Sequence, residues 1–137
     1  MEKSRQCRKI QSPPLMGGFK PFDIRISASE PVVMLYDEYE SLRLLDYDGL
    51  TQEEAAKKMG VSRPTLTRIY EKARKKIAVA FVEGRQLEIN GGNVDFEKRW
   101  YKCKKCHKLI MEQQEHTRCK NCRLFGNDEL ITINKNK

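Results

Sequence analysis

Apolar residues recur every third or fourth position through the middle of the chain. After Asp37, the residues Tyr39, Leu42 and Leu45 repeat at intervals of three, a spacing typical of one face of an α-helix. Glycine at position 49 favours the end of that helix, because glycine adopts the left-handed conformation common just beyond a helix. The pattern therefore predicts a first helix that begins at Asp37 and stops at Gly49.

Two more helices are predicted directly after it. Thr51 and Glu54 have the spacing of a capping box, which begins a short second helix that ends at Gly60. Ser62 is placed to cap a longer third helix that ends at Gly84. The apolar residues of this third helix recur at three and four: Leu66, Ile69, Tyr70, Ala73, Ile77, Ala80 and Phe81.

The flanking segments predict only short strands. Proline and glycine interrupt residues 1–36 and exclude a long helix there, which leaves strands around 24–26 and 32–35. Residues 86–89 predict another strand, and 90–93 predict a turn, because two glycines accept the positive φ that a tight turn needs. We therefore expect a mainly α fold with a three-helix domain and short strands.

The second and third predicted helices have the spacing of a helix-turn-helix. Ala56 is small where two helices must cross closely, and Gly60 stands where the turn needs a left-handed residue. Val61 and Leu66 fill the wedge between the helices. A three-helix core whose basic residues serve only solubility is the alternative interpretation.

The third helix also carries side chains suited to nucleic acid. Arginine can donate two hydrogen bonds to guanine, and threonine offers a hydroxyl and a methyl group to a base pair. We expect base edges or flanking phosphates to be contacted by Arg63, Pro64, Thr65, Thr67 and Arg68. Phosphates are the expected partners of residues further along, namely Lys72, Arg74, Lys75 and Lys76.

The distribution of charge agrees with that interpretation. The chain has 137 residues, with Lys+Arg 27 against Asp+Glu 19, a formal charge of +8 and a pI of about 9.3. Seven acids and one arginine lie between Asp37 and Glu54, whereas six bases and one glutamate lie between Arg63 and Lys76. An acidic helix is therefore expected beside a basic one, and the basic one is the candidate surface for a polyanion.

These motifs resemble known helix-turn-helix proteins. The stretch from Gly49 through Ile77 is similar to region four of bacterial sigma factors. The chain resembles more closely the domain of unknown function 134 family of small predicted DNA-binding proteins. The features that carry this resemblance are Phe19-Lys20-Pro21, the helix that starts Asp37-Glu38-Tyr39-Glu40-Ser41, the helix-turn-helix, and Gly91-Gly92-Asn93. The resemblance covers roughly residues 3–95 and implies a sigma-region-four-like fold and DNA binding without a known target.

A cysteine motif lies beyond that resemblance. Two Cys-x-x-Cys pairs, separated by 12 residues, supply four thiolates for one tetrahedral site: Cys103, Cys106, Cys119 and Cys122. We predict one Zn²⁺ in a small zinc ribbon, with 109–111 and 130–133 as its strands. Iron, two disulfides or a dithiol redox centre are the alternatives, and His107 or His116 can compete as ligands.

Cys7 remains outside this motif. Arg5, Arg8 and Lys9 surround it and can lower its thiol pKa, but a lone cysteine in a basic arm more often has no chemical role. The same arm can follow a phosphate backbone or enter a minor groove, and a disordered basic tail is an equal alternative.

We therefore expect three segments: a basic arm at 1–36, a helix-turn-helix domain at 37–95, and a connector with a zinc ribbon at 96–137. The expected function is sequence-specific binding of double-stranded DNA in transcription regulation. An RNA-binding or ribosome-associated protein, and an adaptor that docks on RNA polymerase or another protein, are the alternatives. No enzymatic motif, signal peptide or membrane span is seen in the sequence, so a cytoplasmic protein with reduced thiols is expected.

Overall fold

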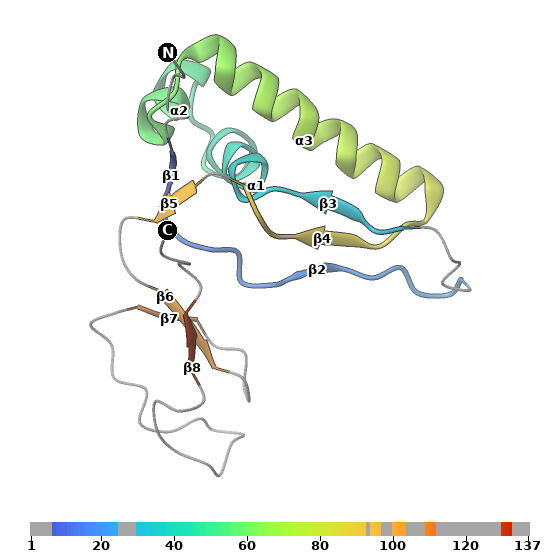
Figure 1. Ribbon diagram of the computed structural model, residues 1–137. Helices are drawn as coiled ribbons and strands as arrows, with labels where there is room; N and C mark the ends of the chain where they lie inside the picture. Colours follow the sequence, from blue (N-terminus) through green and yellow to red (C-terminus); the bar gives the residue numbers. More distant parts are fainter. Residues whose placement is uncertain are drawn as a thin grey trace, which may run out of the picture. The chain divides into compact units, whose positions relative to one another are not determined.

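The computed structural model describes residues 7–24, 30–92, 94–96, 100–103, 109–111 and 130–132 (Figure 1). The chain divides into two compact units. Met1–Ile10 and Met16–Asp95 form the first unit, and Gln11–Leu15 and Phe96–Lys137 form the second. The helices described below all belong to the first unit.

Three α-helices occupy the part of the chain where the sequence predicts them. They are α1 (Tyr36–Leu42), α2 (Gln52–Met59) and α3 (Arg63–Glu83). The first predicted helix continues beyond α1 as a π-helical turn, η1 (Arg43–Tyr47), in which the Asp48 amide donates to the Arg43 carbonyl at 2.8 Å. No described helix combines the length and apolar character that crossing a bilayer requires.

A three-stranded sheet lies against these helices. Its strands are β2 (Gly18–Phe19), β3 (Val32–Met34) and β4 (Leu87–Ile89), in the order β2-β4-β3. β2 is antiparallel to β4, whereas β3 is parallel to it, with Val32 opposite Leu87. The parallel pairing means that all three helices lie between two neighbouring strands, so the sheet and the helices are one structure.

The fold class is accordingly mixed. The expectation of a mainly α chain with short strands is right for the three helices but too narrow, because the described part combines helices and sheet in one α/β arrangement. The strand expected at 24–26 is not formed at Ile24, which lies in a bend, and residues 25 and 26 are outside the described part.

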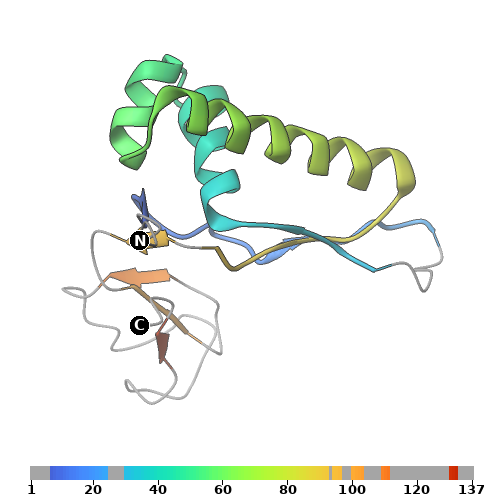
Figure 2. The ribbon, with the colours of Figure 1, turned by 45° about the horizontal axis from the view of Figure 1, so that its top comes forward.

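The second half of α3 covers the sheet. Alternation along β3 places Val32 and Met34 inward and leaves Val33 exposed, as expected for a strand with one buried face. Figure 2 shows α3 running along that face of the sheet. The resulting core is made of Val32, Met34, Ala73, Ala80, Leu87 and Ile89, with partly buried Tyr36, Tyr39, Leu42, Ile77 and Val79 around it.

Shorter strands complete both units. In the first, β1 (Arg8–Ile10) pairs with β5 (Val94–Phe96), of which Val94 and Asp95 belong to this unit. In the second, β6 (Trp100–Cys103) is antiparallel to both β7 (Leu109–Met111) and β8 (Leu130–Thr132). The strand expected at 109–111 is therefore present, and the strand expected at 130–133 is present at 130–132, with residue 133 outside the described part.

Candidate nucleic-acid interface

The α2–α3 corner begins with local hydrogen bonds that the sequence encodes. The Glu54 amide donates to Thr51 Oγ1 at 3.2 Å, and the Thr51 amide donates to Glu54 Oε1 at 3.1 Å. The Thr51 hydroxyl also donates to Glu54 Oε1 at 2.9 Å, and the two hydrogen bonds that the carboxylate accepts, from the Thr51 amide and hydroxyl, hold the pKa of the exposed Glu54 carboxyl below its ordinary value. The reciprocal pair therefore fixes the start of α2 as a capping box.

A three-residue turn joins α2 to α3. Gly60 has φ 68 and ψ 34, the left-handed conformation, and the Val61 amide donates to the Ala56 carbonyl at 3.0 Å. Ser62 then accepts a hydrogen bond from the Thr65 amide at 3.3 Å and caps α3. Backbone conformation and capping together turn the chain sharply, so the first turn of α3 begins directly after α2 ends.

A separate core beneath this corner fixes the angle between the two helices. Ala55 and Met59 on α2 are fully buried against Leu66 on α3, and Leu44 from η1 closes the cluster. Ala56 is 4% exposed at the place where the sequence analysis expects a close helix crossing. The corner is thus a packed structure whose outer side chains are held in place by its interior.

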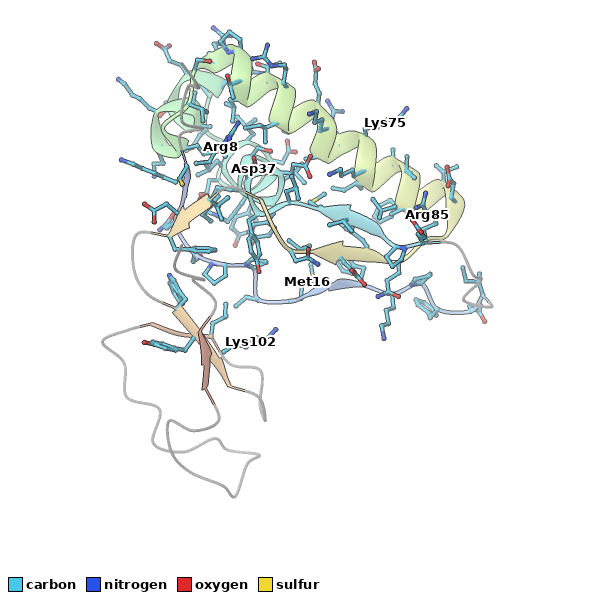
Figure 3. The ribbon with its side chains drawn as sticks, viewed as in Figure 1. Arg8, Met16, Asp37, Lys75, Arg85 and Lys102 are labelled. Carbon is cyan, nitrogen blue, oxygen red and sulfur yellow. The ribbon has the colours of Figure 1, made fainter. Side chains whose placement is uncertain are left out.

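The predicted DNA-binding residues fall into two settings. Exposed side chains are Arg63, Pro64, Arg68, Lys72 and Lys75, and partly buried ones are Thr65, Thr67 and Lys76. Arg68 Nη2 donates weakly to Thr65 Oγ1 at 3.4 Å. Lys75 extends outward from α3 (Figure 3). The structure therefore brings the two arginines and most of the lysines to the surface of one helix.

Thr67 connects α3 with the first turn of α2. Its hydroxyl lies 3.0 Å from Gln52 Oε1 and also 3.0 Å from the Arg63 carbonyl, so it donates within the corner. Gln52 is a site residue that the sequence analysis did not single out. The signal available was its position directly after the capping residue Thr51, where side chains of α2 adjoin the start of α3.

Lys76 is engaged with the interior of the fold. Its ammonium nitrogen is 2.6 Å from Glu38 Oε1, which also accepts the Leu35 amide at 2.8 Å. Glu38 is only 2% exposed. The Lys76–Glu38 pair ties α3 to the first turn of α1, so Lys76 differs from the exposed lysines beside it.

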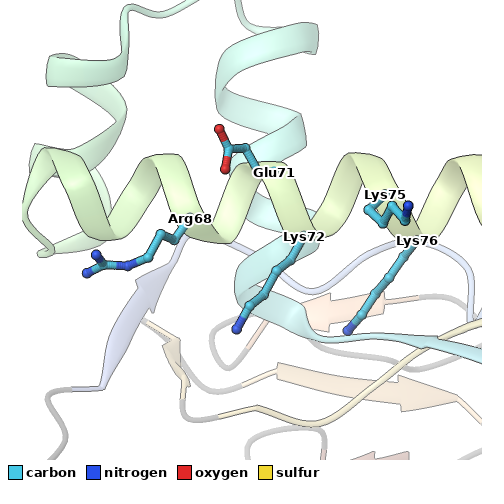
Figure 4. Close-up of a pocket in the computed structure, with 5 residues that line it drawn as sticks. All are labelled: Arg68, Glu71, Lys72, Lys75 and Lys76. Carbon is cyan, nitrogen blue, oxygen red and sulfur yellow. The ribbon is translucent and has the colours of Figure 1, made fainter.

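A basic hollow runs along the side of α3. It has a volume of about 360 Å³ and is lined by Arg68, Glu71, Lys72, Lys75 and Lys76, four bases and one acid. Figure 4 shows Arg68, Lys72 and Lys76 extending to the same side of the helix. A row of cations with this spacing can contact successive anionic groups, as a phosphate backbone presents.

The acidic part of the first unit is balanced by its own cations. Arg43 Nε lies 2.7 Å from Glu40 Oε1 and its Nη1 lies 2.9 Å from Asp48 Oδ2. Arg8 Nε lies 3.7 Å from Asp37 Oδ2, and both residues are labelled in Figure 3. Burial nevertheless raises the pKa of Asp37, and the Glu38 backbone amide and Arg8 oppose that rise.

The proposed metal ligands lie mostly outside the described residues. The backbone of Cys103 ends β6, opposite Leu130 of β8, while Cys106, Cys119 and Cys122 fall outside the described part. Within the described residues no group of three or more histidine, cysteine or acidic side chains is arranged to hold a metal.

The fold and the α3 surface define a small protein with an exposed basic helix after a tight turn. The chain belongs to the family described as Protein of unknown function DUF134, whose profile matches residues 1–97. This agrees with the family resemblance found in the motifs.

Individual relatives carry only a family name. A UPF0251 protein of Chloroherpeton thalassium is 42% identical over 106 residues, which is 77% of this chain and 70% of the relative. A UPF0251 protein of Desulforudis audaxviator is 36% identical over 132 residues, 96% of this chain and 86% of the relative. A third, from Clostridium novyi, is 34% identical over 98% of this chain and 91% of its own length. No solved structure matches this chain.

Proposed function

We propose that the chain binds double-stranded DNA in a sequence-specific manner and regulates transcription. One observation carries the proposal: the exposed first turns of α3, with Arg63 and Arg68, follow a tight turn from α2. In helix-turn-helix proteins the second helix of such a pair lies in the major groove, and its N-terminal residues contact base edges.

Arg63 and Arg68 are the side chains that we assign to bases. A guanidinium has five N–H donors, so the single 3.4 Å contact between Arg68 and Thr65 leaves donors for guanine O6 and N7. Pro64, Thr65 and Thr67 line the same turns. The hydroxyl of Thr67 is engaged inside the corner, so its methyl group is the part that we expect to contact a base.

We assign contacts with phosphates to residues around these two arginines. Lys72 and Lys75 line the basic hollow and are exposed. Gln52 lies at the start of α2 beside Thr67 of α3, and the NH₂ group of its side chain can donate to a phosphate. We assign Lys76 to the stability of the fold, because its partner Glu38 is buried.

We also propose that the second unit holds one Zn²⁺ through Cys103, Cys106, Cys119 and Cys122. Four thiolates in two Cys-x-x-Cys pairs suit a closed tetrahedral site. The antiparallel sheet β7-β6-β8 supports this proposal, because β6 ends at the first of these cysteines. Bound zinc supplies structural cross-linking here, since a Cys₄ set leaves no open position for substrate.

Selection of bound fragments from random duplexes tests the proposed function. The full chain is expected to enrich a short common sequence, and the enriched duplex should bind more tightly than a scrambled duplex in the same salt. Equal affinity for both duplexes would reject sequence-specific recognition. Tighter binding of single-stranded RNA than of either duplex would move the chain to the RNA-binding class.

Substitutions in α3 then separate base contacts from phosphate contacts. Arg68→Ala is expected to reduce the discrimination between selected and scrambled duplexes by about 1–3 kcal/mol, because a bidentate base contact is lost. Lys75→Ala is the matched control, and it should weaken both duplexes alike. Titrations of all three proteins on both duplexes measure this. Equal losses on both duplexes for Arg68→Ala would limit Arg68 to phosphate binding.

A further inference from the structure

The last turns of α3 carry an apolar face that the sheet does not cover. Phe81 is 76% exposed and Val82 is 86% exposed, and Ala78 is exposed one turn before them. Residues 78, 81 and 82 share one side of the helix, since i, i+3 and i+4 are neighbours on a helix surface. The opposite side, at Ala73 and Ala80, is the side buried against the sheet.

The apolar surface continues beyond the end of the helix. Ile24 is 50% exposed and lies against Gly84, where an added Cβ would come within 2.9 Å of Ile24 Cδ1. Gly84 ends α3 with φ 63, so the chain turns away and leaves the face at Phe81 and Val82 accessible. Large apolar side chains that gather at one place on a surface mark an interaction site.

We propose that a second copy of this chain covers the face, with the two α3 helices packed antiparallel and crossing at Ala78. A two-fold interface is self-complementary, so each copy places the same patch on the other. The small side chain of Ala78 permits close approach where the helices cross. In this register, position 74 of one copy faces position 82 of the other, four residues on either side of the crossing.

Charge complementarity favours this occupant. The last turn of α3 has no basic residue, so the negative end of its helix dipole has no cation within the helix, and the charge of Glu83 is paired with Arg85 at 3.3 Å. Arg74, which is exposed, lies one turn before Ala78. An antiparallel second copy brings its own Arg74 to this negative end, and the aliphatic stem of that arginine adjoins Phe81 and Val82.

The spacing of the two recognition surfaces gives a further argument, which rests on the proposed function. Ala78 lies roughly 12.5 residues from the middle of Arg63–Arg68, which at about 1.5 Å per residue is about 19 Å. Two antiparallel copies therefore separate these surfaces by about 38 Å, close to the 34–36 Å between half-sites one helical turn apart. Such a dimer suits a two-fold symmetric DNA site.

Sedimentation of the full chain without DNA tests the proposal. We expect a mass twice that of the 16.0 kDa chain. Val82→Lys should favour the monomer, because it places a base opposite Arg74 of the second copy. The fold of each single chain should tolerate this change, because a base near the C-terminal end of a helix interacts favourably with the helix dipole. Tyr47→Lys is the matched control, because Tyr47 is 84% exposed on η1, and it should leave the dimer intact.

A charge exchange tests the antiparallel register. Val82→Lys is expected to raise the dissociation constant of the dimer about tenfold, as like charges face each other. Adding Arg74→Glu to Val82→Lys should restore dimerisation, because opposite charges then meet across the interface. A monomeric wild type, an unaffected Val82→Lys variant or a double variant that stays monomeric would overturn the proposal. A dimer that binds no DNA would reject only the proposed function.

Discussion

Lys75 and Lys76 are adjacent in the sequence and have different surroundings. A helix turns by about 100° per residue, so neighbouring side chains leave α3 in different directions. Lys75 reaches solvent, whereas the Lys76 ammonium lies 2.6 Å from the buried Glu38 carboxylate. From the sequence alone, both lysines are expected to contact phosphates. The position of α1 in the fold shows that their roles differ.

Removing the Lys76 ammonium should destabilise the fold. Lys76→Met is expected to lower the free energy of unfolding by about 1–3 kcal/mol, because a buried carboxylate loses its charged hydrogen-bond partner. Urea denaturation at neutral pH measures this change. Lys75→Met is the control and should cost less than about 0.5 kcal/mol. Addition of Glu38→Gln to Lys76→Met should recover part of the loss, and equal costs for the two single variants would contradict the assignment.

Asp37 gives a pH dependence whose direction is fixed by burial. Its carboxyl has a pKa above the ordinary value, chiefly because burial disfavours the charged form, and its buried Oδ1 has no hydrogen-bond partner within the described structure. The proton-bound form therefore favours the folded state. Its stabilising effect is fully present below the unfolded pKa of about 3.9 and is lost as pH rises through the folded pKa.

Asp37→Asn should remove that dependence. The stability of the variant relative to wild type is expected to increase from acidic to neutral pH, because only wild type then carries a desolvated charge. Thermal unfolding of both proteins across this pH range measures the difference. A relative stability that falls toward neutral pH would mean that the Arg8 pair outweighs desolvation at this site.

At the scale of elements, the boundaries of the helices follow from local sequence. Thr51 and Ser62 cap α2 and α3, and Gly60 and Gly84 end them in left-handed conformations, as the sequence predicts. Caps and glycine ends depend on a few consecutive residues, so a single sequence contains enough information to find them.

Other features depend on contacts that are distant in the chain. The parallel pairing of β3 with β4 joins Val32 to Leu87, and nothing local to either strand selects that partner or direction. The π-helical turn η1 also escapes prediction, because apolar spacing distinguishes a π turn poorly from an α-helix. In the candidate interface, Gln52 can be identified only from its contact with Thr67, which joins α2 to α3 in the folded structure.

The α2–α3 turn is sensitive to the residue at position 60. Gly60→Ala is expected to lower the free energy of unfolding by about 1–2 kcal/mol, because a Cβ in the left-handed region crowds the backbone. Surrounding space is open, with only Lys9 side-chain atoms at 3.8 Å or beyond, so the cost is conformational. Chemical denaturation measures it.

Two other variants separate backbone strain from a general effect of losing glycine. Gly60→Asn should cost less than Gly60→Ala, because asparagine tolerates the left-handed region. Gly17→Ala should change stability little, since an added Cβ there has no atom within 4 Å and φ is not positive. Equal losses for Gly60→Ala and Gly17→Ala would contradict the role of the left-handed turn.

At the scale of the whole molecule, the two units have different sources of stability. The first has two hydrophobic clusters, one between α3 and the sheet and one between α2 and α3. The described strands of the second are short, at three or four residues each. Small units of this kind generally need a metal or disulfides to fold, and the proposed zinc site would supply that stabilisation.

Metal removal should therefore unfold the second unit and leave the first unit folded. Purified protein is expected to carry one zinc per chain, and chelation should unfold the second unit, because binding and folding are coupled in Cys₄ sites. Metal analysis and amide spectra measure both effects: signals from Trp100 and Tyr101 should collapse while those of α3 persist. Cys106→Ser should lose the metal, whereas Cys7→Ser, at the remaining cysteine, should keep it. A metal-free chain with dispersed signals from β6 would show that the second unit folds on its own apolar contacts.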